Sequence, residues 1–387
     1  MRVLMLSWEY PPRKVGGLAT HVFELSKAIA ERVEIHIVTC NFPGALELES
    51  VGGAVVHRIN VYSAPSPDFL TWAMLMNASL LRAGCELTSE RRFDMIHCHD
   101  WLVAQACVTI KHATGIPLVA TIHSTESGRR HGIHTDYQRV IHEIEGWLTY
   151  EASRIVCCSW SMVNEVAGLF NVPRDKIWMI PNGVDPEIYR PGAIDRSLRD
   201  KYADPNEKIV LYVGRLVPEK GVNVLIGAIP RILFAHPNTK FIIVGEGYSR
   251  EMLSSLSKSL GVDRKVFFTR YVSDDEVKGL LGLADVQVVP SIYEPFGIVC
   301  LEAMASGIPV VASDTGGLSE IVEDGVTGLK VPSDNSNAIA YAVNRLLSDS
   351  ALRESMSKRA RERALAKFSW KAIADLTTQM YDSIFIK

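Results

Sequence analysis

The sequence predicts a doubly wound α/β fold that is built twice along one chain of 387 residues. Short apolar runs rich in β-branched residues alternate with longer segments of helical hydrophobic spacing for most of the length. Runs that are apolar throughout, rather than at every second position, are typical of parallel strands covered by helices on both faces. At roughly 100–200 residues per domain, the length favours two domains. We therefore expect one doubly wound domain in each half of the chain.

The expected strands form two series. The chain starts with a short apolar stretch, which Glu9 and Pro11 end too early for a secretory signal peptide, so we interpret it as a buried first strand. Further strands of the first series are predicted at 33–39, 55–61, 95–98, 118–123 and 154–159, and those of the second series at 209–214, 240–245, 266–268, 286–290 and 310–313. Helices are expected between the strands, including one over 18–30.

A proline-rich stretch separates the two series. It contains Pro181, Pro186, Pro191 and Pro205 and is followed by a charged segment over 195–208. Such a stretch is typical of a linker, which we place near 183–192. The first domain then covers residues 1–187 and the second 188–369. An exposed, charged helix is expected over 353–367, and residues 370–386 have the pattern of a terminal amphipathic helix.

The composition excludes several classes of function. The 41 Lys and Arg residues against 44 Asp and Glu residues give a net charge of −3, which argues against a nucleic-acid partner. No apolar run reaches the roughly 18–20 residues that a membrane-spanning helix requires. Seven cysteines, an odd number without a C-x-x-C pair, indicate buried, reduced thiols and a cytoplasmic location.

Histidines gather in the first half of the chain, and only His236 lies beyond it. His97 and His99 lie at the end of one predicted strand, directly before Asp100, and His123 closes the next strand. The carboxyl ends of parallel strands are where doubly wound sheets bind ligands. Any one of these histidines could simply be satisfied by local hydrogen bonds. Two polar strand ends together favour a site, which we expect to carry acid-base or ligand chemistry.

Gly16 and Gly17 lie in the loop between the first predicted strand and its helix, shortly before His21. Adjacent glycines let a bound group approach the backbone closely, and the amides at the helix N-terminus can bind an anion. The alternative is a plain tight turn. The spacing does not match the G-x-G-x-x-G fingerprint of dinucleotide-binding folds.

Two cations lie at a strand-to-helix junction of the second domain. Arg215 and Lys220 fall between Gly214 and Gly221, directly after a predicted strand. A guanidinium and an ammonium group that converge at such a junction suit a diphosphate. The alternative is ordinary surface charge.

The segment 288–303 is the most informative part of the second domain. A strand ends at Pro290, a loop carries Glu294, and a helix begins near Phe296, so that its first amides can hold a phosphate. Glu302 lies in this otherwise apolar helix and needs a partner there, for which ribose hydroxyls would serve. The alternative is a glutamate on an exposed polar face.

Taken in order, these motifs resemble those of the retaining GT-B glycosyltransferases of family 4, with their glycogen and starch synthase relatives. The matching segments cover nearly the whole chain: Glu9-Tyr10-Pro11-Pro12 with Gly16-Gly17, His97-x-His99-Asp100-Trp101, Thr121-Ile122-His123, Pro181-Asn182-Gly183-Val184-Asp185, Gly214-Arg215-x4-Lys220-Gly221 and Glu294-x7-Glu302. The resemblance implies two Rossmann-like doubly wound domains that face a deep cleft, with the terminal helix 370–387 returning to the first domain.

The resemblance also implies roles for the two domains: the first would hold the acceptor and the second a nucleotide-diphosphate sugar donor. His123 would lie beside the anomeric carbon, Glu294 would face the donor sugar, and Glu302 would bind the ribose. Arg215 and Lys220 would bind the diphosphate and stabilise the leaving group. The implied donor-binding set is Gly16, Gly17, Arg215, Lys220, Glu294, Phe296, Gly297, Ile298, Val299 and Glu302; the implied sugar and acceptor set is His99, Asp100 and Asn182; and the implied catalytic set is His123, Glu294, Arg215 and Lys220.

No metal or other cofactor is expected, because positive charge placed at the leaving oxygens lowers the barrier to sugar departure. A double displacement with retention would need a carboxylate directly beneath the anomeric carbon. The resemblance favours instead a front-face attack, in which the departing phosphate oxygen helps to deprotonate the acceptor.

The acceptor is interpreted from two segments. The opening Ser7-Trp8-Glu9-Tyr10-Pro11-Pro12 and the run 121–147, with its Arg129-Arg130-His131 cluster, are closer to the glucan-forming members than to lipid-linked mannosyltransferases. The chain is shorter than typical bacterial glycogen synthases, but Lys14-Val15-Gly16-Gly17-Leu18 matches the Lys-x-Gly-Gly-Leu motif with which they open, whereas Glu302 follows the family 4 form. We expect transfer of glucose from ADP-glucose or UDP-glucose to an α-1,4-glucan, with the oligomeric state left open.

Three alternatives remain at the level of the sequence. One is a synthase with a small acceptor, of the maltose 1-phosphate, trehalose or sucrose type. Another is a hydrolase in which His97, His99 and Asp100 bind a metal ion. The third is a sensor that binds a nucleotide sugar without turnover.

Overall fold

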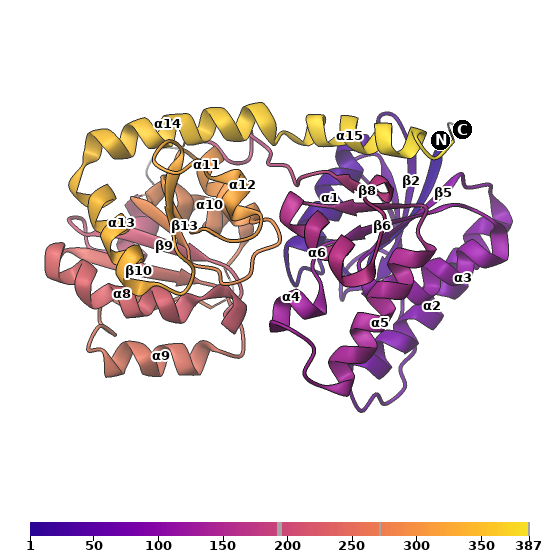
Figure 1. Cartoon of the computed structure of the whole chain (residues 1–387), viewed down its shortest axis with the longest axis horizontal. Coiled ribbons are helices and arrows are strands. Elements are labelled where there is room, and N and C mark those ends of the chain that lie inside the picture. The colour runs from indigo at the N-terminus through magenta and orange to yellow at the C-terminus, as the bar shows by residue number, and fades with distance from the viewer. Residues whose placement is uncertain (192–195, 271, 386–387) are drawn as a thin grey trace. The chain divides into compact units, whose positions relative to one another are not determined.

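The chain forms two units in the computed structural model, which describes residues 1–191, 196–270 and 272–385 (Figure 1). Unit 1 comprises Met1–Asn182 and Trp370–Lys387, and unit 2 comprises Gly183–Ser369. The boundary lies between residues 182 and 183 rather than between 187 and 188. Val184 accounts for the difference, because its N–H donates to Phe368 O at 2.7 Å and it forms an isolated bridge with Ser369, both in unit 2. The predicted linker and charged segment reach residues 192 and 195, which lie outside the described residues.

Unit 1 is built on an eight-stranded sheet in the order β3-β4-β2-β1-β5-β6-β7-β8. All neighbouring strands are parallel except β3 and β4. The strands are β1 (Arg2–Leu6), β2 (Glu34–Cys40), β3 (Leu48–Val51), β4 (Ala54–Ile59), β5 (Met95–His99), β6 (Leu118–Ile122), β7 (Arg154–Cys157) and β8 (Ile177–Met179). The sequence did not predict β3 and β8, because β3 is an exposed edge strand with little apolar content and β8 has only three residues.

Helices cover both faces of this sheet, as expected for a parallel sheet with buried strands. They are α1 (Gly17–Ile29), α2 (Phe69–Glu90), α3 (Ala104–Thr114), α4 (Glu126–Arg130), α5 (Asp136–Glu151), α6 (Trp160–Phe170) and the terminal α15 (Trp370–Asp382). Helices α1 and α15 pack against each other (Figure 1). Val22 and Leu25 of α1 share one hydrophobic core with Ile373 and Tyr381 of α15. The terminal helix is thus part of unit 1, and its polar groups can reach that unit's site.

Unit 2 is built on a six-stranded, fully parallel sheet in the order β11-β10-β9-β12-β13-β14. The strands are β9 (Lys208–Val213), β10 (Thr239–Val244), β11 (Val266–Phe268), β12 (Val286–Val289), β13 (Val310–Ser313) and β14 (Gly328–Val331), the last of which was not predicted. The helices are α7 (Arg196–Tyr202), α8 (Val222–Ala235), α9 (Arg250–Ser259), α10 (Asp274–Leu283), α11 (Ile298–Ala305), α12 (Leu318–Ile321), α13 (Ser336–Ser348) and α14 (Ser350–Lys367).

Both sheets have a topological switch point next to their first strand. In unit 1, β2 lies on one side of β1 and β5 on the other, and in unit 2, β10 and β12 flank β9 in the same way. Doubly wound sheets bind ligands outside the carboxyl ends of the strands at this point. The fold therefore directs attention to the segments that follow β1 and β5 and to those that follow β9 and β12.

The composition predicted that the chain has no membrane-spanning helix and that its cysteines are buried, reduced thiols. Among the helices of the described residues, none is long and apolar enough to cross a membrane. All seven cysteines are free thiols, and six are buried. Cys85 is exposed, contrary to the prediction of buried thiols throughout, because it lies on the outer face of the amphipathic helix α2.

Candidate functional site

The loop after β1 is held by the buried carboxylate of Glu9. Its Oε2 accepts hydrogen bonds from the amides of Val15 and Gly16, the latter at 3.2 Å. Gly16 caps the N-terminus of α1, and a Cβ placed on it would have no heavy atom within 4 Å in the part of the chain that the structure describes. The carboxylate thus orders the loop, and the Gly16-Gly17 backbone stays open to an approaching ligand.

Four histidines meet at the carboxyl ends of β1, β5 and β6. His21 comes from α1, His97 and His99 from β5, and His123 directly follows β6. Ring centroids are 4.8 Å apart for His21 and His123, 5.5 Å for His99 and His123, and 4.3 Å for His97 and His99. His123 is half-buried and the other three are buried. The structure therefore brings the histidines predicted from two strand ends into one cluster.

Each buried histidine of this cluster has a defined partner. His97 is held on both sides, since its Nδ1 lies 2.7 Å from Tyr381 OH and its Nε2 lies 2.7 Å from Thr121 Oγ1. His21 Nδ1 lies 2.7 Å from Asn182 Oδ1. His99 Nδ1 lies 3.2 Å from His123 Nε2. Asn182, predicted to contact sugar or acceptor, thus contacts a histidine in this structure.

Burial keeps this cluster neutral near pH 7. Desolvation lowers the pKa of His21 to about 4 and that of His97 to about 3. It also lowers the pKa values of His99 and His123 well below the ordinary range, with neighbouring histidines adding to the effect. Neutral imidazoles can accept hydrogen bonds or bind metals, but they supply no positive charge.

Asp100 is the acid beside the histidines. Its Oδ1 accepts a hydrogen bond from the His123 amide at 3.3 Å, and its backbone lies in the left-handed region with φ of 68°. Burial raises the pKa of this carboxyl group to about 6, although the charge of Arg129 and the hydrogen bond from His123 act against the rise. A non-glycine residue at positive φ is strained, and such strain is often found at functional sites.

A second buried acid, Glu145 of α5, was missed by the sequence reasoning. It accepts hydrogen bonds from the Glu126 amide at 2.8 and 3.1 Å and lies 3.5 Å from Arg129 Nη2. Arg129 also pairs with Glu126 at 2.9 Å. Burial raises the pKa of Glu145 to about 8 despite the nearby guanidinium. The position of Glu145 between Ile141 and Leu148 on the buried face of α5 is the signal that could have found it.

In unit 2, the predicted Lys220 and Glu294 are joined by an ion pair. Lys220 Nζ donates to Glu294 Oε2 at 2.7 Å, and Ser291 Oγ donates to the same oxygen at 2.9 Å. Arg215 is half-exposed, with its Nη2 lying 3.5 Å from Glu219 Oε1. Lys220 follows β9 and Glu294 follows β12, so the pair spans the switch point of this sheet.

Two glycines allow the loops around this pair to touch through their backbones. A Cβ on Gly221, where φ is +63°, would lie 2.0 Å from Pro290 O, and one on Gly316, where φ is +50°, would lie 2.0 Å from Glu294 O. The Gly317 amide donates to Glu294 O at 2.9 Å. The segments after β9, β12 and β13 are therefore packed tightly at the carboxyl end of the sheet.

Helix α11 presents its N-terminus directly after Glu294-Pro295-Phe296. Gly297 caps the helix with φ of 108°, and within the described residues the amides of Ile298 and Val299 have no hydrogen-bond acceptor. Unpaired amides at a helix N-terminus are suited to an anion. Later in this helix, half-buried Glu302 accepts a hydrogen bond from Tyr189 OH at 2.8 Å. Tyr189 is thus a partner that the sequence did not reveal.

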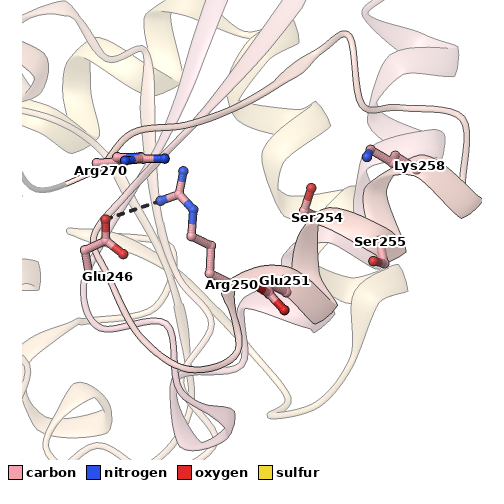
Figure 2. A pocket seen from close by; sticks show the side chains of 7 residues that line it. All are labelled: Glu246, Arg250, Glu251, Ser254, Ser255, Lys258 and Arg270. Atoms are coloured by element: carbon pink, nitrogen blue, oxygen red, sulfur yellow. Dashed lines mark ion pairs between the residues drawn. The ribbon is translucent and has the colours of Figure 1, made fainter.

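A polar hollow of about 550 Å³ lies elsewhere in unit 2, beside α9 (Figure 2). Arg250 is held there by Glu246 at 3.6 Å and by Phe268 O at 3.3 Å, and Figure 2 marks the ion pair between Arg250 and Glu246. The hollow is lined by Glu246, Arg250, Glu251, Ser254, Ser255, Lys258 and Arg270. None of these residues belongs to the predicted site.

Two family patterns match the chain. Residues 15–188 match the family described as Glycosyltransferase Family 4, and residues 194–363 match Glycosyl transferases group 1. The first match covers most of unit 1 and the first six residues of unit 2, and the second covers most of unit 2.

Similar proteins extend over the whole chain. An uncharacterized glycosyltransferase of Methanocaldococcus jannaschii is 40% identical, with 98% of each chain covered. A glycogen synthase of Mycobacterium tuberculosis is 36% identical over 98% of this chain and 94% of its own. An alpha-maltose-1-phosphate synthase of Mycolicibacterium smegmatis is 30% identical over 99% of this chain and 100% of its own.

Among solved structures, a sucrose-phosphate synthase of Thermosynechococcus elongatus matches with a TM-score of 0.89 and 26% identity, covering 99% of both chains. Together with the two parallel sheets described above, this match confirms the predicted fold class, two doubly wound units of the GT-B type.

Proposed function

Because this chain belongs to the family 4 glycosyltransferases, we propose that it transfers glucose from ADP-glucose or UDP-glucose to an α-1,4-glucan with retention of configuration. The observation that carries this proposal is the Lys220–Glu294 pair at the switch point of unit 2, where doubly wound sheets bind nucleotides. The 36% identity with a glycogen synthase along almost the whole chain supports the choice of glucose and glucan.

The donor diphosphate is assigned to the cationic end of unit 2. Arg215 is half-exposed, and Glu294, paired with Lys220, lies directly before α11, whose first amides are unpaired in the described residues. Negative charge grows on the leaving diphosphate as the bond between the sugar and the diphosphate breaks. Cations that are already in place therefore stabilise the transition state more than they stabilise the bound donor. Transfer is proposed to need no metal cofactor, because these residues supply the charge.

Glu294 and Glu302 are assigned to the sugar and ribose of the donor. Glu294 is oriented by Lys220 and Ser291, and its carboxyl oxygens can accept hydrogen bonds from sugar hydroxyls. Glu302 is oriented by Tyr189, which leaves it in place to accept hydrogen bonds from ribose hydroxyls. The pairing of Glu294 with a lysine supports a binding role over that of a nucleophile.

His123 is assigned to the donor sugar and Asp100 to the acceptor. The neutral His123 ring, which is half-buried, can exchange hydrogen bonds with a hydroxyl of the transferring glucose without adding charge near an oxocarbenium-like carbon. Retention is proposed to arise from attack on the same face that the diphosphate leaves. The departing phosphate oxygen then takes the proton of the acceptor hydroxyl.

The state of Arg129 supports an uncharged acceptor. This arginine lies beside Asp100 and is a cation that could bind a phosphorylated acceptor, but Glu126 and Glu145 already contact it at 2.9 and 3.5 Å. A phosphate would have to compete with the carboxylate of Glu126 and with the carboxyl group of Glu145. A glucan, which carries no charge, does not face this competition.

Synthesis of maltose 1-phosphate is the second candidate function, favoured by the 30% identity with a synthase of that product along the full length of both chains. A matrix of donors and acceptors separates the two. We expect diphosphate release and glucan elongation with ADP-glucose or UDP-glucose plus glycogen, and α-1,4 linkages in the product. Turnover with glucose 1-phosphate alone would support the second candidate, and no release from any sugar nucleotide would contradict both.

A further inference from the structure

Three of the four clustered histidines, His21, His99 and His123, each place a ring nitrogen near a common point, and binding of a sugar donor does not require this arrangement. One ring nitrogen from each of His21, His99 and His123 lies within 4.8 Å of the other two. In the described ranges 1–191, 196–270 and 272–385, this is the only group of three or more histidine, cysteine or acidic side chains with such an arrangement. His97 is excluded from the set, because Tyr381 and Thr121 occupy both of its nitrogens.

The cluster contains nitrogens that the surrounding protein does not satisfy. His21 Nε2 and His99 Nε2 are both buried and have no hydrogen-bond partner in the described structure. Asn182 Oδ1 accepts from His21 Nδ1–H, and this contact places the free lone pair of the ring on Nε2. A buried lone pair without a donor is costly unless a ligand binds it.

This arrangement resembles the ligand shell of a transition-metal ion. A histidine that binds a metal through one nitrogen commonly donates its other N–H to a carbonyl or carboxylate, as His21 does to Asn182. Three histidines with an open fourth position form a common zinc site, and neutral imidazoles bind zinc without first losing a proton. Asp100 accepts a hydrogen bond from the His123 amide, so its carboxyl group lies beside the site. This acid can offset the charge of a bound cation.

The distances are compatible with a small adjustment on binding. Zinc–nitrogen bonds of about 2.0–2.1 Å at tetrahedral angles hold ligand nitrogens roughly 3.3–3.4 Å apart. One ring nitrogen of each histidine already lies within 4.8 Å of the other two, so the nitrogens need to approach one another by about 1.4 Å at most. The half-buried ring of His123 marks the side from which an ion can enter.

We propose that unit 1 binds one Zn²⁺ ion through His21, His99 and His123, and that the bound ion blocks glycosyl transfer. The binding site follows from the geometry alone. The inhibition rests on the proposed function, because it requires that His123 contact the donor sugar. The site differs from the hydrolase site considered from the sequence, which used His97 and Asp100 in place of His21 and His123.

Metal binding is measured directly on the full-length chain. Zn²⁺ is titrated in competition with a chromophoric chelator, and Co²⁺ is used as a spectroscopic probe of coordination. We expect one equivalent per chain and a visible Co²⁺ spectrum of four-coordinate intensity. His21→Gln should weaken Zn²⁺ binding more than tenfold, and Asn182→Ala, which removes the partner of His21, should weaken it about 10- to 100-fold.

The matched control is His57→Gln. His57 belongs to another close histidine pair in unit 1, with His36 Nδ1 3.0 Å from His57 Nε2, but that pair is not part of a three-ligand group. Its loss should leave Zn²⁺ affinity within about twofold of the original. Far-UV circular dichroism checks that each variant folds. If His21→Gln does not fold, His123→Gln, which alters the more accessible ring, gives the same test.

The outcomes separate the two proposals. Stoichiometric binding that His21→Gln or His123→Gln abolishes, with activity lost on Zn²⁺ addition and regained with chelator, supports both. Such binding by a protein without transferase activity would support the site and contradict the proposed function. An active enzyme that binds no Zn²⁺, or binds it equally well in all variants, would overturn the metal site alone.

Discussion

The two units place different chemistry at the same position of the same fold. At the switch point of unit 1, the polar side chains are buried histidines that desolvation keeps neutral, and the acids beside them have raised pKa values. At the switch point of unit 2, Lys220 and Glu294 form a charged pair and Arg215 is half-exposed. The fold determines where a ligand can bind, whereas the partners of the buried groups distinguish the two sites: Asp100 and Glu294 are 7% and 8% exposed, but only Glu294 of the two forms an ion pair with a lysine in the described structure.

The largest expected effect comes from a substitution in the charged pair of unit 2. Lys220→Ala should lower kcat by about 10²–10³-fold, because it removes the positive charge that stabilises the growing negative charge on the leaving diphosphate. Nucleotide affinity, measured by calorimetry, should fall much less. The control is Lys208→Ala, which removes another ion-paired lysine, at the opposite end of β9 and 3.0 Å from Asp285. A kcat near that of the original protein would contradict the role of Lys220.

The role of the neutral histidines of unit 1 is tested by His123→Ala. Loss of one hydrogen-bonding ring at the donor sugar should reduce kcat by about 10- to 100-fold. The fold and the nucleoside diphosphate affinity should change little, since the ring is half-buried and lies in unit 1. Steady-state kinetics and a binding isotherm measure the two quantities separately. If affinity fell as much as kcat, the assignment of His123 to the sugar would be wrong.

A third substitution tests how rigidly the charged pair is held. Gly316→Ala should lower the free energy of unfolding by about 1–3 kcal/mol, because the new Cβ meets Glu294 O and the backbone has positive φ. Gly325→Ala is the matched control, since its φ is +72° but no described heavy atom lies within 4 Å of the added Cβ. Chemical denaturation of both variants separates the close contact from the backbone strain. Equal losses would show that the contact contributes nothing.

The smallest effect is a pH dependence that tests the claim that burial suppresses charge in unit 1. The pKa of Glu145 is raised from 4.5 to about 8, so the folded state holds its proton more tightly than the unfolded state. Its contribution to stability is therefore complete below about pH 4.5 and is lost as the pH rises through 8. Relative to Glu145→Gln, the original protein should lose stability between pH 5 and pH 9 in denaturant titrations.

Glu151, in the same helix, is the control, because its pKa is lowered whereas that of Glu145 is raised. Lys111 holds the pKa of this carboxyl below its ordinary value, so any contribution of Glu151 is lost only at lower pH. The effect of Glu151→Gln is measured in a His112→Gln background, because His112 Nε2 lies 2.9 Å from Glu151 Oε2 and is charged only when protonated, and there it should stay constant from pH 5 to pH 9. A flat difference for Glu145→Gln as well would contradict the raised pKa of Glu145.

Much of the fold could be predicted because its signals are local. All ten strands named after the first one match observed strands to within two residues, and helix 18–30 corresponds to α1 at 17–29. Unbroken apolar runs identify buried parallel strands whatever their neighbours are. The exposed edge strand β3 and the short strands β8 and β14 lack that signal, and the unit boundary depended on the contacts of Val184 with Phe368 and Ser369.

The candidate site was predicted in part. The strand-end positions of His99, Asp100, His123 and Lys220 follow from the sequence, because polar residues there interrupt apolar runs. The partners of these residues do not follow from it. Lys220 pairs with Glu294, 74 residues away, and Glu302 bonds to Tyr189, 113 residues away. Pairings over such separations depend on the register of the sheet and the packing of its loops.

The sequence by itself therefore determined the doubly wound architecture, the family and the strand ends that carry polar residues, because each depends on local pattern and order along the chain. Only the tertiary structure decided the protonation and pairing of those residues. His97 is neutral because burial lowers its pKa, and it is fixed by Tyr381, 284 residues later; His21 is oriented by Asn182, 161 residues away. Desolvation and hydrogen bonding depend on all the atoms around a group, and these atoms come together only when the chain folds.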